Sequence, residues 1–433
     1  MINKETINRR HFMLSLVGSF ALTQELLAHT NQTNKLPSRQ WLAVQAFIDK
    51  YVSDKRIAGA AVALSYGDKD LSYLKAGKVA FDSSTNFDEN SLCRIYSMTK
   101  PVTGVAAMML IEAGKIRLDQ PVADIIPEFR TLTVAVDAKK SFESRPLVNT
   151  MTMRHLLTHT SGLVYWTPLS GDDILPSAYR ERGITPGNYG SRLDRPGYGP
   201  QAKNLEEMVK RVAELPLAFE PGARWQYSIG LDVMGLIIER VSGKGLEVFL
   251  RERIFEPLGM TSTGFQVMTK DAARLTTNYM ITPEGLKPTD AGATSVWLKS
   301  ATLPAGGAGL VSTARDFSRF GAMVLGNGSL GKVRLLKRET ARLAISNLLP
   351  PGVVFPLGGG FGAGARVVLA GNENKRFGSP GSFGWGGAAG TIWQIDPARR
   401  GNMVFMSQHM PPETSLREDV AAAIEADLKS IKI

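Results

Sequence analysis

Strand-like segments at both ends of the chain enclose a long helical stretch, and no other feature of this sequence constrains the fold as strongly. Near the N-terminus, residues 58–65 and 71–79 flank Gly67-Asp68, a dipeptide that favours the tight turn of an antiparallel hairpin. Near the C-terminus, three further segments have the apolar pattern of strands, at 359–370, 391–397 and 403–409. We therefore expect one sheet assembled from the two ends of the chain, with helices inserted between them.

Apolar residues at helical spacing mark the helices of this predicted fold. They predict helices at 41–51, 97–113, 205–214, 230–242, 246–254, 313–325, 338–346 and 416–431. The segment 97–113 is rich in Ala, Met and Leu, which indicates a buried central helix that ends at Gly114. The predicted fold class is α/β, an antiparallel sheet flanked by helices, with an inserted mainly helical lobe.

A chain of 433 residues exceeds the size at which a single hydrophobic core usually stops growing, so we expect two lobes. Residues 38–96 and 305–433 are predicted to form the sheet lobe and residues 97–304 the helical lobe, with the functional site in the cleft between them. Residues 165–200 are rich in Pro and Gly and predict a long irregular loop. Such loops are often functional, so this one is expected to shape a substrate pocket.

The first 28 residues resemble an export signal of the twin-arginine type. Arg9-Arg10 precedes an apolar stretch from Phe12 to Leu22, which is too short to span a bilayer, and the sequence turns polar from Thr30. We therefore expect a periplasmic or secreted protein without stable membrane insertion. The alternative interpretation is an N-terminal amphipathic helix of a cytoplasmic protein.

Charge and composition exclude several function classes. The net charge of +11 comes from Lys and Arg residues dispersed among acidic ones, without the basic runs that track a phosphate backbone, so no nucleic-acid partner is expected. The single cysteine, Cys93, rules out an internal disulfide framework and a multi-cysteine metal site. His155 and His159 stand four residues apart, but Leu156 replaces the Glu of H-E-x-x-H, which favours structural hydrogen bonds over zinc. No metal or organic cofactor is expected.

Ser97-Met98-Thr99-Lys100 is the sharpest chemical motif in the sequence. Residues three apart share one face of a helix, so the Ser97 hydroxyl and the Lys100 amine would lie within hydrogen-bond reach. A serine hydroxyl becomes a nucleophile when a neighbouring base takes its proton, and a desolvated lysine can serve as that base. A Ser and a Lys at this spacing also occur by chance at solvated helix starts, so other motifs must show whether Ser97 and Lys100 are catalytic. No G-x-S-x-G elbow supports the alternative α/β-hydrolase nucleophile.

Two further segments supply chemically suitable groups. Tyr227 follows a Pro-Gly turn just before a predicted helix, where a phenol can exchange protons with Lys100, although a purely packing role is the alternative. Trp385-Gly386-Gly387-Ala388 would let a substrate approach an edge-strand backbone, whose N–H groups can bind an oxyanion, although glycine-rich turns often mean only a bend.

These motifs, in this order, resemble the serine β-lactamase and penicillin-recognising superfamily, with S-x-x-K, then Y-x-N, then a K-T-G strand. Four longer segments resemble its class C and esterase branches: MTMRHLLTHTSGL, EPGARWQYSIGLDVMGLIIERVSG, FEPLGMTSTGF and PAGGAGLVSTARDFSRF. The resemblance implies that Ser97 is the nucleophile and that Lys100 and Tyr227 form the base pair. It also implies an oxyanion hole made by the N–H groups of Ser97 and Ala388.

The departures from this pattern narrow the expected function. Ile229 replaces the Asn of Y-x-N, and Trp385-Gly386-Gly387 replaces Lys-Thr-Gly, which removes an amide and a cation that would bind a β-lactam. Both changes favour a neutral substrate, and Trp385-Gly386-Gly387 is similar to the same segment of the family VIII carboxylesterases, which implies hydrolysis of short-chain or small neutral esters. The alternatives are an acyltransferase or transesterase, a weak β-lactamase or D-aminopeptidase, and a non-catalytic penicillin-binding-type sensor. Asp232 could orient a polar group, but the sequence favours a role in the first turn of its own helix.

Overall fold

A seven-stranded antiparallel sheet combines strands from the two ends of the chain. The computed structural model describes residues 41–432 except 168–172, 189–195, 357, 373–377 and 412–414, so the predicted export signal lies outside the described residues. Its strands, in the order in which they lie side by side, are β11 (Gly360–Phe361), β12 (Arg366–Val367), β13 (Phe383–Gly386), β14 (Ile392–Asp396), β15 (Gly401–Met406), β1 (Gly59–Ser65) and β2 (Ser72–Gly77). N-terminal β1 (Gly59–Ser65) pairs on one side with β2 (Ser72–Gly77) and on the other with β15 (Gly401–Met406), so the predicted hairpin and the shared sheet are both confirmed.

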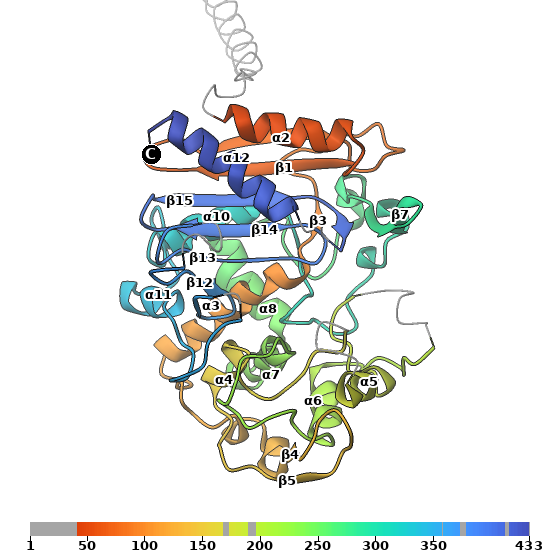
Figure 1. The fold of residues 1–433 in the computed structure, drawn as a ribbon, viewed down its shortest axis with the longest axis vertical. Helices are drawn as coiled ribbons and strands as arrows, with labels where there is room; N and C mark the ends of the chain where they lie inside the picture. Colours follow the sequence, from red (N-terminus) through yellow and green to blue (C-terminus); the bar gives the residue numbers. More distant parts are fainter. Residues whose placement is uncertain are drawn as a thin grey trace, which may run out of the picture. The chain divides into compact units, whose positions relative to one another are not determined.

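Alternation along β1 explains how the sheet is buried on both faces. Val62 and Leu64 pack into a cluster with α2 (Leu42–Ser53) and α12 (Leu416–Ser430), whereas Ala61 and Ala63 pack into the main core on the other face. Helix α10 (Ala314–Leu325) covers β14 (Ile392–Asp396) and β15 on that second face. Figure 1 shows α2 and α12 together beside β1, on one side of the sheet.

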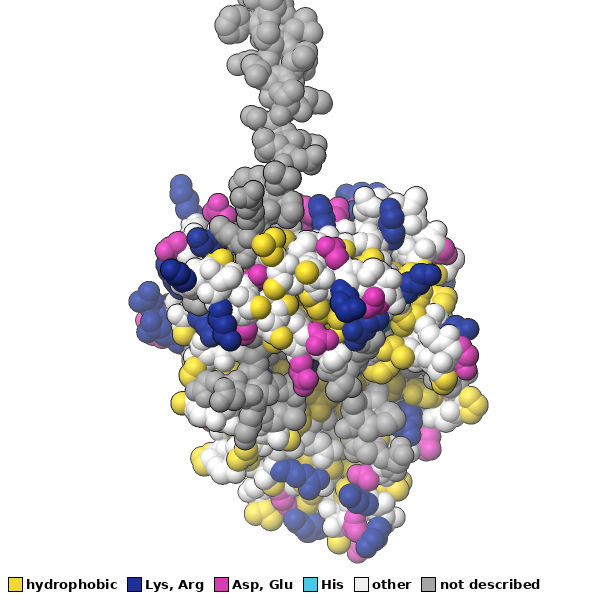
Figure 2. Space-filling view, turned by 45° about the horizontal axis from the view of Figure 1, so that its top comes forward, with side chains coloured by type: hydrophobic (Ala, Val, Ile, Leu, Met, Phe, Trp, Pro, Cys, Tyr) yellow, Lys and Arg dark blue, Asp and Glu magenta, His cyan; other side chains and the backbone are white. Residues whose placement is uncertain are grey.

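The surface over α2 and α12 carries mixed charge. Lys and Arg side chains alternate with Asp and Glu side chains over the face shown in Figure 2. The positive charge on this face is therefore dispersed, as the sequence suggested. None of the helices in the described part of the chain combines the length and apolarity needed to cross a bilayer.

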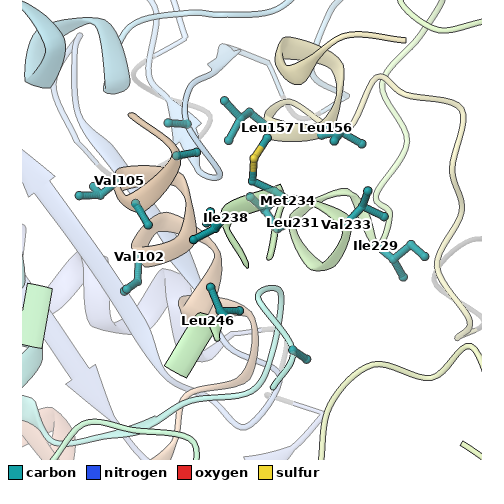
Figure 3. Close-up of a cluster of buried hydrophobic side chains, with 14 of the residues drawn as sticks. Val102, Val105, Leu156, Leu157, Ile229, Leu231, Val233, Met234, Ile238 and Leu246 are labelled. Carbon is teal, nitrogen blue, oxygen red and sulfur yellow. The ribbon is translucent and has the colours of Figure 1, made fainter. Parts of the chain in front are cut away.

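Helix α3 (Thr99–Glu112) is the central helix, and its residues from Thr99 to Leu110 are all buried. It packs on α7 (Gly230–Ser242), which in turn packs on α4 (Met153–Leu157). Figure 3 shows the apolar side chains that join these helices, with Val102 and Val105 from α3, Leu156 and Leu157 from α4, and Met234 and Ile238 from α7. This core holds the first turn of α3 rigidly against the start of α7.

The remaining elements are short. The helices are α5 (Ile174–Glu181), α6 (Leu205–Ala213), α8 (Leu246–Leu250), α9 (Glu256–Leu258) and α11 (Arg338–Ala344), and a π-helical turn at Arg251–Phe255 joins α8 to α9. Minor strand pairs are β3 (Cys93–Arg94) with β8 (Val311–Ser312), β4 (Thr133–Ala135) with β5 (Ser144–Pro146), and β9 (Ser329–Leu330) with β10 (Val333–Arg334). Strand β6 (Asn278–Thr282) pairs with β7 (Gly285–Asp290) and with β16 (His409–Met410).

Three predicted segments differ most from the structure, and the predicted helix 246–254 ends as α8 at Leu250 and continues as the π-helical turn. The segment 359–370 forms two strands, β11 (Gly360–Phe361) and β12 (Arg366–Val367), because a turn containing Gly364 at φ +80° separates them. The segment 403–409 ends as β15 at Met406, and β16 follows in another sheet. The predicted irregular loop 165–200 contains helix α5, whose buried residues include Leu175 and Tyr179. The described residues form a single compact unit, and the lobe boundaries at 96/97 and 304/305 stay a prediction.

Candidate active site

Ser97 lies on a tight turn at the start of the central helix. The predicted helix from Ser97 begins instead with a 3₁₀ turn (Tyr96–Met98), and the α-helix starts at Thr99. Tyr96, directly before Ser97, has φ of +38°, a left-handed conformation that is uncommon for residues other than glycine. Such strained positions concentrate at functional sites. Ser97 is half-buried, so its hydroxyl is held by the fold yet remains accessible.

Ser97, Lys100 and Tyr227 meet as the sequence predicted. Tyr227 donates its hydroxyl proton to Ser97 Oγ at 2.6 Å, and Lys100 Nζ donates to the same oxygen at 3.3 Å. Lys100 Nζ also lies 4.5 Å from the centroid of the Tyr227 ring. Lys100 is fully buried, whereas Ser97 and Tyr227 are only partly so. Two groups able to exchange protons therefore converge on one accessible hydroxyl.

The segment 306–310 fixes the start of α3 through a series of hydrogen bonds. Lys100 Nζ donates to the carbonyl of Gly307 at 2.8 Å, and Thr103 Oγ1 donates to the carbonyl of Gly306 at 2.6 Å. Leu310 N donates to Thr99 Oγ1 at 3.1 Å. Because these bonds come from one stretch of backbone, the Lys100 amine is held in one position beside Ser97.

Asp232 lies behind this segment. Its Oδ1 accepts a hydrogen bond from Gly307 N at 2.8 Å, so the carboxylate is directed at the segment 306–310. The sequence favoured a role in the first turn of the helix that carries Asp232, and this role did not include a contact with Gly307. Burial raises the pKa of Asp232 to about 6, and the positive charge of Lys100 opposes that rise. The sequence contained both residues, but their spacing of 75 residues gave no signal of this contact.

The segment 385–388 lies beside Ser97. Strand β13 (Phe383–Gly386) is next to the 3₁₀ turn, and a Cβ added to Gly387 would lie only 2.3 Å from the carbonyl oxygen of Ile95. Gly387 N donates to Thr391 O at 2.8 Å, so this N–H is already used. Ala388, the predicted oxyanion donor, is half-buried. A glycine at position 387 is thus required by the close approach of this segment to the backbone just before Ser97.

Aromatic rings surround Tyr227. Trp385 stacks on it with centroids 6.0 Å apart, and Tyr165 packs against it at 5.1 Å. Trp225 lies 6.3 Å from the Tyr227 ring and 4.9 Å from Phe355. At the position where the superfamily pattern has a lysine, this chain therefore presents an indole, which suits an apolar rather than an anionic group.

His159 packs against Tyr227 and hydrogen-bonds to the next residue, Ser228. Its Nδ1 accepts a hydrogen bond from Ser228 N at 3.2 Å, and its ring lies 4.7 Å from the Tyr227 ring. Burial and the positive charge of Lys100 lower the pKa of His159 well below its usual value. His155 accepts a hydrogen bond from Thr152 N at 3.1 Å at the start of α4. Both rings thus hydrogen-bond within the chain, and no group of three or more His, Cys, Asp or Glu suited to a metal occurs among the described residues.

Comparison with known proteins agrees with this geometry. The model of the family described as Beta-lactamase matches residues 44–428. The chain belongs to the β-lactamase family. Protein Rv1367c of Mycobacterium tuberculosis is 32% identical, over 90% of this chain and 94% of that protein. Esterase EstB of Burkholderia gladioli is 30% identical, over 82% of this chain and 87% of that protein.

A solved structure confirms the fold of this β-lactamase family member. The structure of EstCE1, a hydrolase with promiscuous acyltransferase activity, matches with a TM-score of 0.73 and 24% identity, covering 88% of this chain and 97% of that chain. The β-lactamase/transpeptidase-like fold predicted from the sequence is therefore correct. The proteins that resemble this chain thus include an esterase and a hydrolase with acyltransferase activity.

Proposed function

We propose that this chain is a carboxylesterase that hydrolyses short-chain or small neutral esters through an acyl-enzyme on Ser97. The observation that carries the proposal is the convergence of Tyr227 Oη, at 2.6 Å, and Lys100 Nζ, at 3.3 Å, on the Ser97 hydroxyl. The similarity to an esterase over most of both chains supports the choice of an ester as substrate.

The chemistry follows as two acyl transfers. Ser97 Oγ attacks the ester carbonyl carbon while its proton passes to the Lys100/Tyr227 pair. The oxyanion that develops is bound by the N–H groups of Ser97 and Ala388, next to Gly386 and Gly387. The tetrahedral species then collapses, the C–O bond to the alcohol breaks, and the alcohol leaves with the proton. Water repeats the sequence on the acyl-enzyme, which releases the acid and restores Ser97.

Trp385 supports a neutral substrate. An indole stacked on Tyr227 replaces the cation that would pair with a carboxylate, and Ile229 replaces an amide side chain. A β-lactam, which carries a carboxylate, would therefore lose both polar contacts. Weak β-lactamase or D-aminopeptidase activity is correspondingly less supported. The presence of Ser97, Lys100 and Tyr227 together argues against a non-catalytic sensor role.

The second candidate function is acyl transfer to an alcohol. Nothing in the two-step scheme distinguishes water from an alcohol as the acceptor, and EstCE1, which shares the fold, combines hydrolase with acyltransferase activity. Hydrolysis of p-nitrophenyl butyrate in the presence of rising concentrations of a small alcohol measures the partition. A dominant ester product at millimolar alcohol would favour the transferase.

The test of the main proposal is hydrolysis of p-nitrophenyl acetate and butyrate by the wild type and by Ser97→Ala. The wild type is expected to show a burst of p-nitrophenol and an acyl adduct on the peptide that contains Ser97. Full activity in Ser97→Ala would show that the nucleophile lies elsewhere. Nitrocefin turnover at rates comparable with the esters would instead favour a β-lactamase.

We also propose a periplasmic or secreted location, with the cytoplasm as the alternative. The support is Arg9-Arg10 followed by the apolar stretch up to Leu22. Fractionation of cells that express the wild type and the Arg9→Lys, Arg10→Lys variant tests it. Export of both proteins to the same extent would contradict a twin-arginine route.

A further inference from the structure

Asp232 carries a buried carboxylate that the proposed chemistry does not use. It lies in the first turn of α7 and is only 1% exposed. Its Oδ1 accepts the N–H of Gly307, whose carbonyl accepts a hydrogen bond from Lys100 Nζ, both at 2.8 Å. A single glycine thus connects the carboxylate to the amine beside Ser97.

Close packing makes this connection stiff. A Cβ added to Gly307 would lie 2.5 Å from Asp232 Oδ2, and one added to Gly306 would lie 2.5 Å from Leu231 O. No side chain therefore fits between the carboxylate and the backbone that holds Lys100. The Asp232 carboxylate and the Lys100 amine thus bind the N–H and the carbonyl of the same closely packed glycine.

Charge connects the same two residues. Lys100 is fully buried, and a buried cation is costly unless a negative group lies close by. Among side-chain charges, that of Lys100 acts most strongly on Asp232. His159 is the other buried titratable group that the charge of Lys100 affects. An imidazole ring carries no negative charge, so His159 cannot balance the charge of Lys100.

We infer that Asp232 is a positioning residue of the reaction, which holds Lys100 through Gly307 and balances the positive charge that forms on its amine. The inference rests on the proposed function. When Ser97 attacks, its O–H bond breaks and the proton passes to the lone pair of the neutral Lys100 amine, either directly or by a relay in which Tyr227 Oη takes the Ser97 proton and gives its own to the amine. The negative Asp232 stabilises the resulting ammonium ion, and the Gly307 carbonyl keeps it in place. Asp232 itself transfers no proton.

The experiment compares acylation rates in Asp232→Asn and in a matched control. Asn keeps the acceptor for Gly307 N but removes the charge. Asp316→Asn is the control, because Asp316 is also a buried carboxylate that accepts a backbone N–H, from Ser262, but lies in α10 away from Lys100. The rate of the p-nitrophenol burst is measured from pH 5 to pH 8, together with the unfolding temperature of each variant.

At pH 8 we expect Asp232→Asn to acylate roughly 10- to 100-fold more slowly than the wild type, and Asp316→Asn at the wild-type rate. Since the pKa of Asp232 is about 6, the wild-type carboxyl becomes neutral at lower pH. The ratio of wild-type to Asp232→Asn rates should therefore fall toward one near pH 5. A large ratio that stays constant with pH would mean a structural role only, and would overturn the inference.

Failure of the inference and failure of the proposed function give different results. If the wild type forms no adduct on Ser97, the function is wrong. If it forms the adduct and Asp232→Asn acylates at the wild-type rate at pH 8, the function stands and the inference falls. If Asp232→Asn folds poorly, the added change Lys100→Met removes the unbalanced amine and should restore the unfolding temperature. Failure to restore it would also count against the pairing.

Discussion

The indole of Trp385 is stacked on the phenol ring of Tyr227, with the two ring planes only 22° apart. Phe361 packs edge-on against Trp385, with ring centroids 5.2 Å apart and ring planes at 74°. Trp385 stands where the superfamily pattern has a lysine, and its aromatic packing therefore holds Tyr227 in place. The tryptophan at this position thus removes a cation from the substrate side and also supports Tyr227, a group of the proposed reaction.

Trp385→Ala should lower kcat/KM for p-nitrophenyl butyrate about fivefold, because an aromatic pair contributes about 1 kcal/mol beyond its buried area and Tyr227 loses its stacking partner. Trp385→Phe, which keeps a ring at this position, should retain most of the activity. Steady-state kinetics of the two variants checks this. Equal losses in both would show that the indole acts by something other than stacking.

Tyr227→Phe removes only the hydroxyl that donates to Ser97 Oγ. We expect kcat to fall roughly 10²- to 10³-fold, since a positioned proton-transfer group usually contributes that much. The ring contacts with Trp385 and His159 remain, so the unfolding temperature should change little. Activity within a few-fold of the wild type would leave Lys100 as the sole base.

Local signals explain which elements could be predicted from the sequence. The predicted bounds of α7 match the structure residue for residue, because a Pro-Gly turn precedes the helix and Gly243 adopts the left-handed conformation that ends it. The β1–β2 hairpin was predictable from its apolar strands and the Gly67-Asp68 turn. In contrast, the turn at Gly364 split a strand-like run, because its conformation depends on packing against the carbonyl of Lys100.

The candidate site divides in the same way. Ser97 and Lys100 were predictable because they are three residues apart on one helical turn, and Tyr227 because its motif follows in a fixed order. The contact between Asp232 and Gly307 joins residues far apart in sequence, and only the packing of α7 against the segment 306–310 brings them together. The stacking of Trp385 on Tyr227 likewise could not be predicted, since the two rings also come from distant parts of the chain.

His155 should make stability depend on pH. Burial and the nearby charge of Arg154 lower the pKa of His155 to about 4, below its usual value of about 6.5. Between pH 4 and pH 6.5 the unfolded chain binds a proton at His155 that the folded chain does not. The contribution of His155 to the free energy of unfolding is therefore complete above about pH 6.5 and is lost as the pH falls. The contribution between pH 7.5 and pH 5 is about 2 kcal/mol.

His155→Asn should remove this pH-dependent loss, since an Asn side chain can still accept from Thr152 N. Urea unfolding of the wild type and the variant at pH 7.5 and pH 5 measures the effect. The loss of stability on acidification should be smaller in the variant by about 2 kcal/mol. An identical loss in both proteins would contradict the assignment to His155.

Gly387→Ala tests how closely the segment 385–388 must approach the nucleophile. The added methyl group would lie 2.3 Å from Ile95 O and 2.3 Å from Thr391 Oγ1, so the segment must move away from the turn that carries Ser97. Because the neighbouring N–H of Ala388 is the proposed oxyanion donor, kcat should fall roughly 10- to 100-fold. Overpacking of this kind should also cost about 1–3 kcal/mol of stability, which urea unfolding measures.

Gly245→Ala is the matched control for Gly387→Ala. Its added Cβ would meet nothing closer than Glu239 Oε1 at 3.9 Å, so it should leave the esterase kinetics unchanged. A fall in kcat confined to Gly387→Ala separates the effect of backbone approach at the nucleophile from a general effect of replacing glycine. If Gly387→Ala keeps the wild-type kcat and loses only stability, the segment 385–388 braces the fold and the oxyanion donors must be sought elsewhere around Ser97.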